Sequence, residues 1–354
     1  MSIIIYSSLV TLFSLIIMKK VSVNIGLLDK PNERKLHDGM VPLIGGICVF
    51  FGAFASLLIV GPVTSELISL FIVAMGIVLL GALDDKYDLS VTVRLFFQSI
   101  FTVSLIFYQD HYISHLGDIL GLGNISMGIF GILFTIIAVV AAINAFNMLD
   151  GIDGLVGASS IVSLSGIAIL AYINSHSTIF TICLAMIVAL SVYLFFNINP
   201  FKLLKNKVFM GDAGSMLVGF LITWLIVLSL KPGDNGESLF RPVTALYLLA
   251  LPLMDMIAIM YRRVKKKESP FKADRDHIHH IFMRLGFSDR QALLVLVTFG
   301  TLFMLLGLSF EYFLAPEWFS LLIFCGFFLF YCHFIQHAWV YTKNLKLLLD
   351  KCCR

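Results

Sequence analysis

Long apolar runs alternate with short polar stretches over the whole chain. A run of roughly 20 apolar residues is long enough to cross the hydrocarbon core of a bilayer as a helix. The sequence contains eleven such runs, near residues 3–18, 42–60, 66–83, 93–109, 127–146, 157–173, 178–196, 213–230, 242–261, 291–314 and 318–338. The pattern predicts an all-α polytopic membrane protein, a bundle of about eleven transmembrane helices.

Composition agrees with this interpretation. Hydrophobic residues make up 59% of the chain and charged residues 13%, and the mean hydropathy is +0.95, far from the balance of a soluble domain. No low-complexity linker and no clear internal repeat divides the sequence. We therefore expect residues 1–354 to form a single integral-membrane domain, with functional loops near 19–42, 84–92, 147–156, 197–212 and 262–290.

Basic residues predict how the chain is oriented. Lys19 and Lys20 follow the first apolar run and no basic residue precedes it, which favours a retained first span with the N-terminus outside over a cleaved signal peptide. Alternating spans then leave only Lys231 and Arg241, of the 25 Lys and Arg residues, on the outer side. This bias predicts that the polar loops and the C-terminus are cytoplasmic. The net charge of +3 is too small to indicate nucleic acid.

Acidic residues follow the third apolar run directly. Asp84 and Asp85 close this run, and Asp88 comes four residues after Asp84, so a continued helix would bring the three carboxylates together. Neighbouring carboxylates repel one another unless a cation or a proton lies between them. Two interpretations stay open here, a metal or proton site and a polar helix end that marks the membrane interface.

Amides, acids and glycines end the fifth apolar run. The segment from Asn144 to Gly154 reads Asn-Ala-Phe-Asn-Met-Leu-Asp-Gly-Ile-Asp-Gly. Asn147 can offer a carbonyl oxygen to a metal, and Asp150 and Asp153 can accept hydrogen bonds from a base or a sugar. A simple turn would explain Gly151 and Gly154 but not this set of polar side chains.

An aromatic residue and an acid precede the eighth apolar run. Asp212 stands between two glycines near the expected N-terminus of a helix, a position that suits an anion and a metal bound to it. Phe209 either stacks on a base or anchors the chain at the membrane interface.

Histidines and cations occupy two further polar stretches. His277, His279 and His280 follow Arg275, and hydrogen bonding to phosphate or proton handling suits them better than zinc. Lys35 adds a cation to the same membrane face. Asp255, inside the ninth run, is costly in lipid and either serves a substrate or bonds a neighbouring helix.

These motifs together resemble the polyprenyl-phosphate N-acetylhexosamine-1-phosphate transferase family. The resemblance rests on Asp84-Asp85, the segment from Asn147 to Gly154, Phe209-Met-Gly-Asp212 and His277-Ile-His-His280, in register over nearly the whole chain. The His-Ile-His-His form is most similar to the bacterial WecA branch. The resemblance implies transfer of N-acetylglucosamine 1-phosphate from UDP-N-acetylglucosamine to undecaprenyl phosphate, with release of UMP. This is the first membrane step of a cell-surface polysaccharide pathway of the O antigen or enterobacterial common antigen type.

The resemblance also implies roles for individual residues and a metal, Mg²⁺ or Mn²⁺. By similarity, Asp212 and Asn147 help to hold the metal, and Asp84 and Asp85 act near the lipid phosphate. These two aspartates and Asp150 are the expected catalytic residues. The remaining roles are uracil binding by Asp153 and Phe209 and binding of the diphosphate or sugar by Lys35, Arg275, His277, His279 and His280. The expected partners are UDP-N-acetylglucosamine, undecaprenyl phosphate and the lipid bilayer of the bacterial inner membrane, without nucleic acid; a homo-oligomer is left open.

Several alternatives stay open at this point. An aspartate either removes a proton so that the lipid phosphate attacks directly, or itself attacks and forms a covalent phosphoryl intermediate. Within the family, the sister that transfers phospho-muramoyl-pentapeptide and enzymes for another UDP-N-acetylhexosamine are the competitors. A cation-coupled transporter is the alternative from another class, although transport sites lie near the midplane of the bilayer.

Overall fold

Helices account for almost all regular structure in the part of the chain that the computed structural model describes. It describes residues 1–29, 39–199, 207–231, 238–271 and 277–352, with side chains up to residue 337. The helices are α1 (Ser2–Ile25), α2 (Gly45–Val60), α3 (Ser65–Tyr87), α4 (Val91–Gln109), α5 (Phe130–Leu149), α6 (Leu155–Ile173), α7 (Ser177–Ile198), α8 (Gly211–Ser229), α9 (Pro242–Leu248), α10 (Ala250–Lys265), α11 (Ile278–Arg284), α12 (Asp289–Tyr312) and α13 (Glu317–Cys352). The predicted all-α membrane fold is confirmed.

Each of the eleven apolar runs contains helix. Nine helices of the described chain are individually long and apolar enough to cross a membrane, and the bent pair α9 and α10 makes up to ten. The remaining one, α2, has 16 residues. The number of spans and the orientation of the termini stay predictions.

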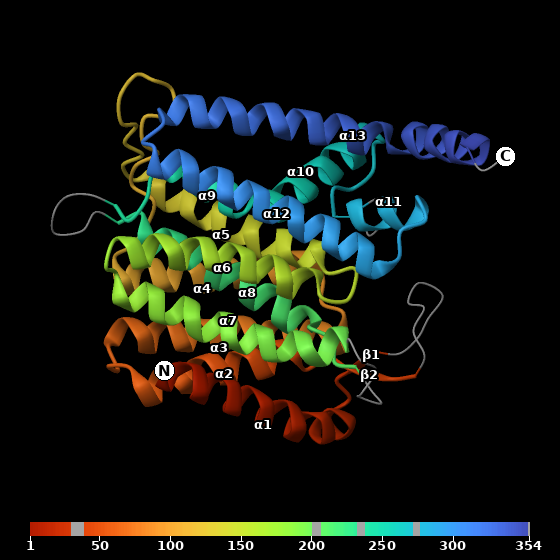
Figure 1. Cartoon of the computed structure of the whole chain (residues 1–354). Helices are drawn as coiled ribbons and strands as arrows, with labels where there is room; N and C mark the ends of the chain where they lie inside the picture. The colour runs from red at the N-terminus through yellow and green to blue at the C-terminus, as the bar shows by residue number, and fades with distance from the viewer. Residues whose placement is uncertain (30–38, 200–206, 232–237, 272–276, 353–354) are drawn as a thin grey trace.

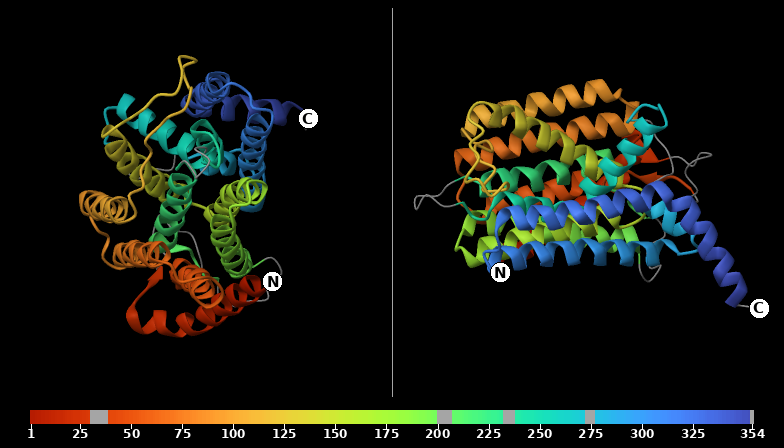
Figure 2. Two further views of the ribbon diagram at one scale, coloured as in Figure 1. Left: turned by 90° about the vertical axis from the view of Figure 1, so that its left-hand side faces the viewer. Right: turned by 90° about the horizontal axis from the view of Figure 1, so that it is seen from above.

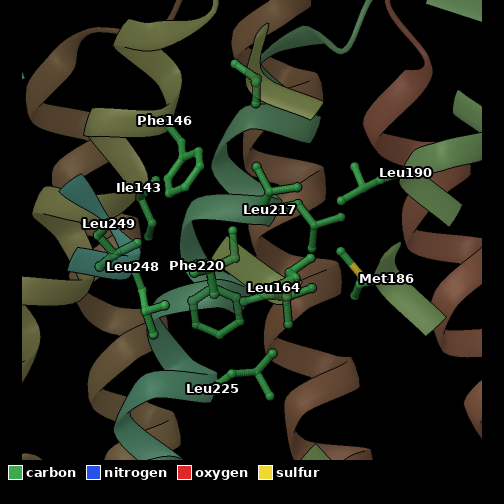
Figure 3. Packing of buried hydrophobic residues seen from close by; sticks show 14 of the residues in the cluster. Ile143, Phe146, Leu164, Met186, Leu190, Leu217, Phe220, Leu225, Leu248 and Leu249 are labelled. Carbon is green, nitrogen blue, oxygen red and sulfur yellow. The ribbon is translucent and has the colours of Figure 1, made fainter. Parts of the chain in front are cut away.

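Helix α8 forms the centre of the bundle, and α2, α3, α5 and α6 pack around it (Figures 1 and 2). Of the 18-residue apolar stretch of α8 that could cross a membrane, 89% is buried inside the protein. Small residues let neighbouring backbones come close: a Cβ on Gly46 of α2 would lie 2.1 Å from Gly214 of α8, and one on Gly81 of α3 would lie 2.4 Å from Ala213. Figure 3 shows Leu217 and Phe220 of α8 in the apolar core between the other helices. The first turn of α8 is therefore held close to α2 and α3.

The ninth apolar run is not one straight helix, which corrects the prediction for 242–261. It breaks at Leu249 into α9 and α10, which are bent by 79°. Pro252 has no N–H, so it cannot donate to the Leu248 carbonyl one turn earlier. The Ser163 hydroxyl of α6 donates to that carbonyl at 2.7 Å instead. The break therefore survives in an apolar environment because another helix satisfies the exposed carbonyl.

The described parts of the five polar stretches lie at one end of the bundle (Figure 1). At this end β1 (Leu28–Asp29) and β2 (Val41–Pro42) form an antiparallel pair, and α11 lies between α10 and α12 in the chain. The connector near residues 110–129 lies at the opposite end. Helix α13 continues to Cys352 and so extends well beyond the predicted end at residue 338. The described acids, amides and histidines of these stretches thus lie at the same end of the bundle.

Candidate active site

Asp84 and Asp85 occupy the last turn of α3 but point to different neighbours. The helix ends because Asp88 takes a left-handed conformation with φ 52°. Asp88 is exposed, whereas Asp84 is buried, so these two carboxylates lie in different surroundings. Consecutive residues on a helix point about 100° apart, so Asp84 faces α4 and Asp85 faces α8.

Asp84 is buried and paired with an arginine. It is 4% exposed, its Oδ2 accepts a hydrogen bond at 2.7 Å from the Arg94 guanidinium of α4, and its Oδ1 accepts from the Leu89 amide at 2.8 Å. A buried carboxylate keeps its charge at low cost only with such partners. Arg94 is therefore part of the site, although in the sequence its position near a span end indicates only membrane orientation.

Asp85 caps the N-terminus of α8. Its Oδ1 accepts from the Asp212 amide at 2.9 Å and its Oδ2 from the Ala213 amide at 3.2 Å. Free amides at a helix N-terminus favour a negative charge. A Cβ at Gly211 would come within 2.6 Å of the Asp85 carboxylate, so glycine is needed at this approach. The two aspartates at the end of α3 thus have distinct partners.

Asn147 and Asp212 lie in direct contact. The Asn147 side-chain amide of α5 donates to the Asp212 carboxylate at 2.7 Å and to the Ser215 hydroxyl at 3.0 Å. The Asp212 carboxylate is also near enough to Asp84 and Asp85 for their charges to repel. Residues from three separate motifs therefore meet at the first turn of α8.

The turn between α5 and α6 carries the next acids. Asp150 is the exposed residue that ends α5, and Gly154 starts α6 with φ 84°, a conformation that favours glycine. Asp153 forms an ion pair with Lys207. Lys207 is a second cation that the sequence reasoning had not assigned to the site.

Phe209 joins two distant segments through its backbone. Its amide donates to the Pro42 carbonyl at 2.9 Å, and its carbonyl accepts from the Gly45 amide at 2.9 Å. The side chain is half-buried. This tie places the segment before α8 beside the start of α2.

The histidines divide into different environments. His277 Nδ1 lies 2.7 Å from the Asp255 carboxylate. His279 is 1% exposed, neither ring nitrogen has a hydrogen-bond partner among the described residues, and burial lowers its pKa to about 3, with His280 acting in the same direction. A neutral buried imidazole therefore lies against the turn after α5, where a Cβ on Gly151 would lie 2.0 Å from its Nε2.

Two predicted site residues, Lys35 and Arg275, lie outside the described residues. Among those described, the structure brings together Asp84, Asp85, Asn147 and Asp212 and sets His279 against Gly151. Of the two interpretations of Asp255, the structure supports the bond to neighbouring protein segments, since its carboxylate accepts from His277 and Tyr331. Arg94 was recognisable in the sequence as a cation only three residues into an apolar helix.

The donor set suits a hard divalent cation. Within the described residues, no group of three or more His, Cys, Asp or Glu side chains is arranged to hold a metal ion. The Asp212 carboxylate and the Asn147 amide group that donates to it nevertheless carry oxygens of the kind that magnesium and manganese prefer. Three acids, Asp84, Asp85 and Asp212, lie close together here, and the Arg94 guanidinium pairs with one of them, Asp84. The excess of negative charge in a buried place fits a cation bound from solution.

Comparison with known proteins identifies the family of this chain. The glycosyl transferase family 4 model matches residues 67–230. A Yersinia pestis protein named undecaprenyl-phosphate alpha-N-acetylglucosaminyl 1-phosphate transferase is 41% identical over 97% of this chain and 93% of its own length. Proteins of the same name from Escherichia coli O157:H7 and Haemophilus influenzae are 40% and 41% identical, over 95% and 94% of this chain and 90% and 93% of their own. Because this identity spans nearly the whole of both chains, the chain belongs to glycosyl transferase family 4, among its polyprenyl-phosphate N-acetylhexosamine-1-phosphate transferases.

Proposed function

We propose that this protein transfers N-acetylglucosamine 1-phosphate from UDP-N-acetylglucosamine to undecaprenyl phosphate. The products are undecaprenyl-diphosphate N-acetylglucosamine and UMP, and the reaction begins a cell-surface polysaccharide pathway of the O antigen or enterobacterial common antigen type. The observation that carries the proposal is the meeting of Asp85, Asn147 and Asp212 at the first turn of α8. The near full-length identity to the named transferases supports it.

In this reaction an oxygen of the lipid phosphate attacks the phosphorus atom that carries the sugar. The bond between that phosphorus and the bridging oxygen breaks, and UMP leaves with the oxygen. Both reactants are anions, so their approach requires positive charge. Arg94 and Lys207 supply part of it from the described chain, and we expect Lys35 and Arg275 to supply more.

We propose that the protein uses magnesium or manganese at Asp212 and Asn147. When bound, the metal would neutralise charge on the phosphate groups. Asp85 and Asn147 orient Asp212 for this task. Asp85 accepts a hydrogen bond from the Asp212 backbone amide, and Asn147 donates one to the Asp212 carboxylate.

For the chemical step we favour direct displacement, with Asp84 or Asp85 taking the remaining proton from the lipid phosphate. Every oxygen of these two carboxylates already accepts a hydrogen bond from Arg94 or a backbone amide. A carboxylate that attacked phosphorus would have to leave these partners, whereas proton uptake at a second lone pair would not require it. Asp150, exposed beside this cluster, is the remaining catalytic candidate.

Substrate binding is assigned to the residues around the cluster. Asp153 and Phe209 would receive uracil, with Lys207 beside Asp153, and the histidines, Lys35 and Arg275 would bind the diphosphate and sugar. The active site would face the cytoplasm of a bacterial inner membrane, because that orientation leaves only two of the 25 basic residues outside.

The test is an assay of purified protein with undecaprenyl phosphate, magnesium and a panel of UDP sugars, followed by UMP release. We expect turnover with UDP-N-acetylglucosamine and a loss of at least about 100-fold in Asp84→Asn, Asp85→Asn and Asp212→Asn. Asp88→Asn is the matched control, because Asp88 is exposed on the same helix end and Asn tolerates its left-handed backbone. Wild-type rates in all three variants would remove the basis of the assignment.

The same assay separates the alternatives. Turnover with UDP-N-acetylmuramoyl-pentapeptide alone would identify the sister activity instead. A labelled phosphosugar trapped on the protein without lipid would favour the covalent route, whereas strict dependence of UMP release on lipid supports direct displacement.

A further inference from the structure

Asp255 is a buried carboxylate inside the bent ninth span. It lies on α10 and is 1% exposed. An ionised carboxylate at such a position is costly unless protein groups replace the water around it. The contacts it makes therefore indicate why the chain keeps an acid here.

Among the described residues, three groups donate hydrogen bonds to this carboxylate. Oδ2 accepts from His277 Nδ1 at 2.7 Å, and Oδ1 accepts from the Tyr331 hydroxyl at 2.8 Å and from the Ile278 amide at 3.3 Å. Tyr331 belongs to α13, and Ile278 begins α11. Asp255 thus links α10, α11 and α13 at one buried point.

The hydrogen bond to Asp255 determines the tautomer and the orientation of the His277 imidazole ring. A carboxylate accepts and does not donate, so Nδ1 of His277 must carry the hydrogen in this bond. The other nitrogen, Nε2, then points away from Asp255, and the ring cannot turn over without losing the bond. The hydrogen bond from the Ile278 amide to Asp255 also fixes the first turn of α11 relative to α10.

His277 in turn touches the histidine that lies against the candidate site. The rings of His277 and His279 are nearly parallel, with centroids 5.8 Å apart and 9° between the planes. The His279 ring lies against Gly151, in the turn that carries Asp150 and Asp153. A rotation of His277 would therefore displace His279 relative to this turn.

We propose that Asp255 is a positioning residue for the transferase reaction. It fixes the orientation and tautomer of His277 and anchors the start of α11, so that the histidine segment faces the diphosphate of the nucleotide sugar. Asp255 itself touches neither substrate. This inference rests on the proposed function, and it adds a residue on a membrane-spanning helix whose effect passes through His277.

The test compares three single variants and one double variant in the UMP-release assay. Asp255→Asn keeps the side-chain volume but can turn its NH₂ toward Nδ1, which favours the other tautomer. We expect kcat to fall by at least about tenfold while the KM for UDP-N-acetylglucosamine changes less. In a His277→Ala background the same substitution should change kcat by less than about twofold, because the group that it positions is gone.

Tyr331→Phe is the matched control, since it removes another hydrogen bond to the same carboxylate and leaves His277 in place. It should lower the thermal unfolding temperature and keep kcat within about threefold of wild type. An equal loss of kcat in Tyr331→Phe and Asp255→Asn, or an equal effect of Asp255→Asn with and without His277, would show that Asp255 only holds helices together and would overturn the proposal.

A second measurement does not depend on turnover. Nitrogen chemical shifts of histidine-labelled protein, with the His277 signals assigned by their loss in His277→Ala, should show hydrogen on Nδ1 in wild type and a changed tautomer in Asp255→Asn. An unchanged tautomer would refute the inference. Absence of UMP release by the wild-type protein would count against the proposed function, and the shifts would still decide whether Asp255 orients His277.

Discussion

The contact between Gly151 and His279 makes the sharpest prediction about the site. In Gly151→Ala the new methyl carbon would lie 2.0 Å from Nε2 and 2.2 Å from Cε1 of the His279 ring. Ordinary contact begins at 3.4 Å, so the ring has to retreat by about 1.4 Å. The ring is 1% exposed and stands between the rings of His277 and His280, so it cannot simply swing into solvent.

The expected cost follows from that displacement. Overpacking of this size destabilises by about 1 to 3 kcal/mol. A group displaced by about 1 Å at an active site loses on the order of 100-fold in rate. We expect Gly151→Ala to remain folded in detergent, as judged by size-exclusion chromatography and thermal unfolding, and to lose about 100-fold in kcat/KM for UDP-N-acetylglucosamine.

The assay is the initial rate of UMP release over a range of UDP-N-acetylglucosamine at saturating undecaprenyl phosphate. Gly326→Ala serves as the control for an added methyl group, because Gly326 lies inside α13 and a Cβ there meets no described atom within 4 Å. Combined with His279→Ala, Gly151→Ala should cause no further loss, since the ring that it displaces is absent. A wild-type rate in Gly151→Ala, or a further large loss in the double variant, would refute the reasoning.

Three further predictions concern stability, each measured by thermal unfolding in detergent. Arg94→Ala leaves Asp84 buried without its cation and should destabilise by about 3 to 5 kcal/mol; an unchanged unfolding temperature would show that the ion pair does not stabilise the fold. Ser163→Ala removes the donor to the Leu248 carbonyl and should cost about 1 to 3 kcal/mol, whereas Ser191→Ala, at an exposed hydroxyl, should cost less. The pKa of His279 falls from 6.5 to about 3 on folding, so the unfolded state binds its proton first and stability should fall as the pH drops from about 6.5 toward 3. His279→Phe should be less sensitive over this range, and an identical pH profile would contradict the burial of a neutral ring.

The sequence predicted the helices well because their signal is local. A run of apolar residues marks a span wherever it occurs, and each predicted run contains helix. The exception is the break at Leu249, where Pro252 inside an apolar run was read as part of a continuous helix. The prediction that the polar stretches share one end of the bundle followed from alternation of spans, and the arrangement of the described residues agrees with it.

The sequence did not predict which partners the site residues contact. Asp84 and Asp85 are adjacent in the sequence and have the same chemistry, yet one is paired with Arg94 and the other caps α8. Arg94 and Lys207 were interpreted only as orientation signals, because a basic residue near a span end serves that purpose in any membrane protein. Asp255 had two interpretations, and its bonds to His277 and Tyr331 show that it contacts neighbouring protein segments.

By itself, the order of apolar and polar residues determined that this chain is a helical membrane protein with its acids, amides and histidines at the ends of spans. Both properties depend on hydropathy and on residues close together in the chain. Tertiary structure alone decided which of these groups touch. The close approach of α3 to α8 at Gly81 and Ala213 sets Asp85 on the helix terminus, and the start of α11 sets His277 on Asp255. Such contacts depend on how helices from distant parts of the sequence pack against one another, which spacing along the chain does not encode.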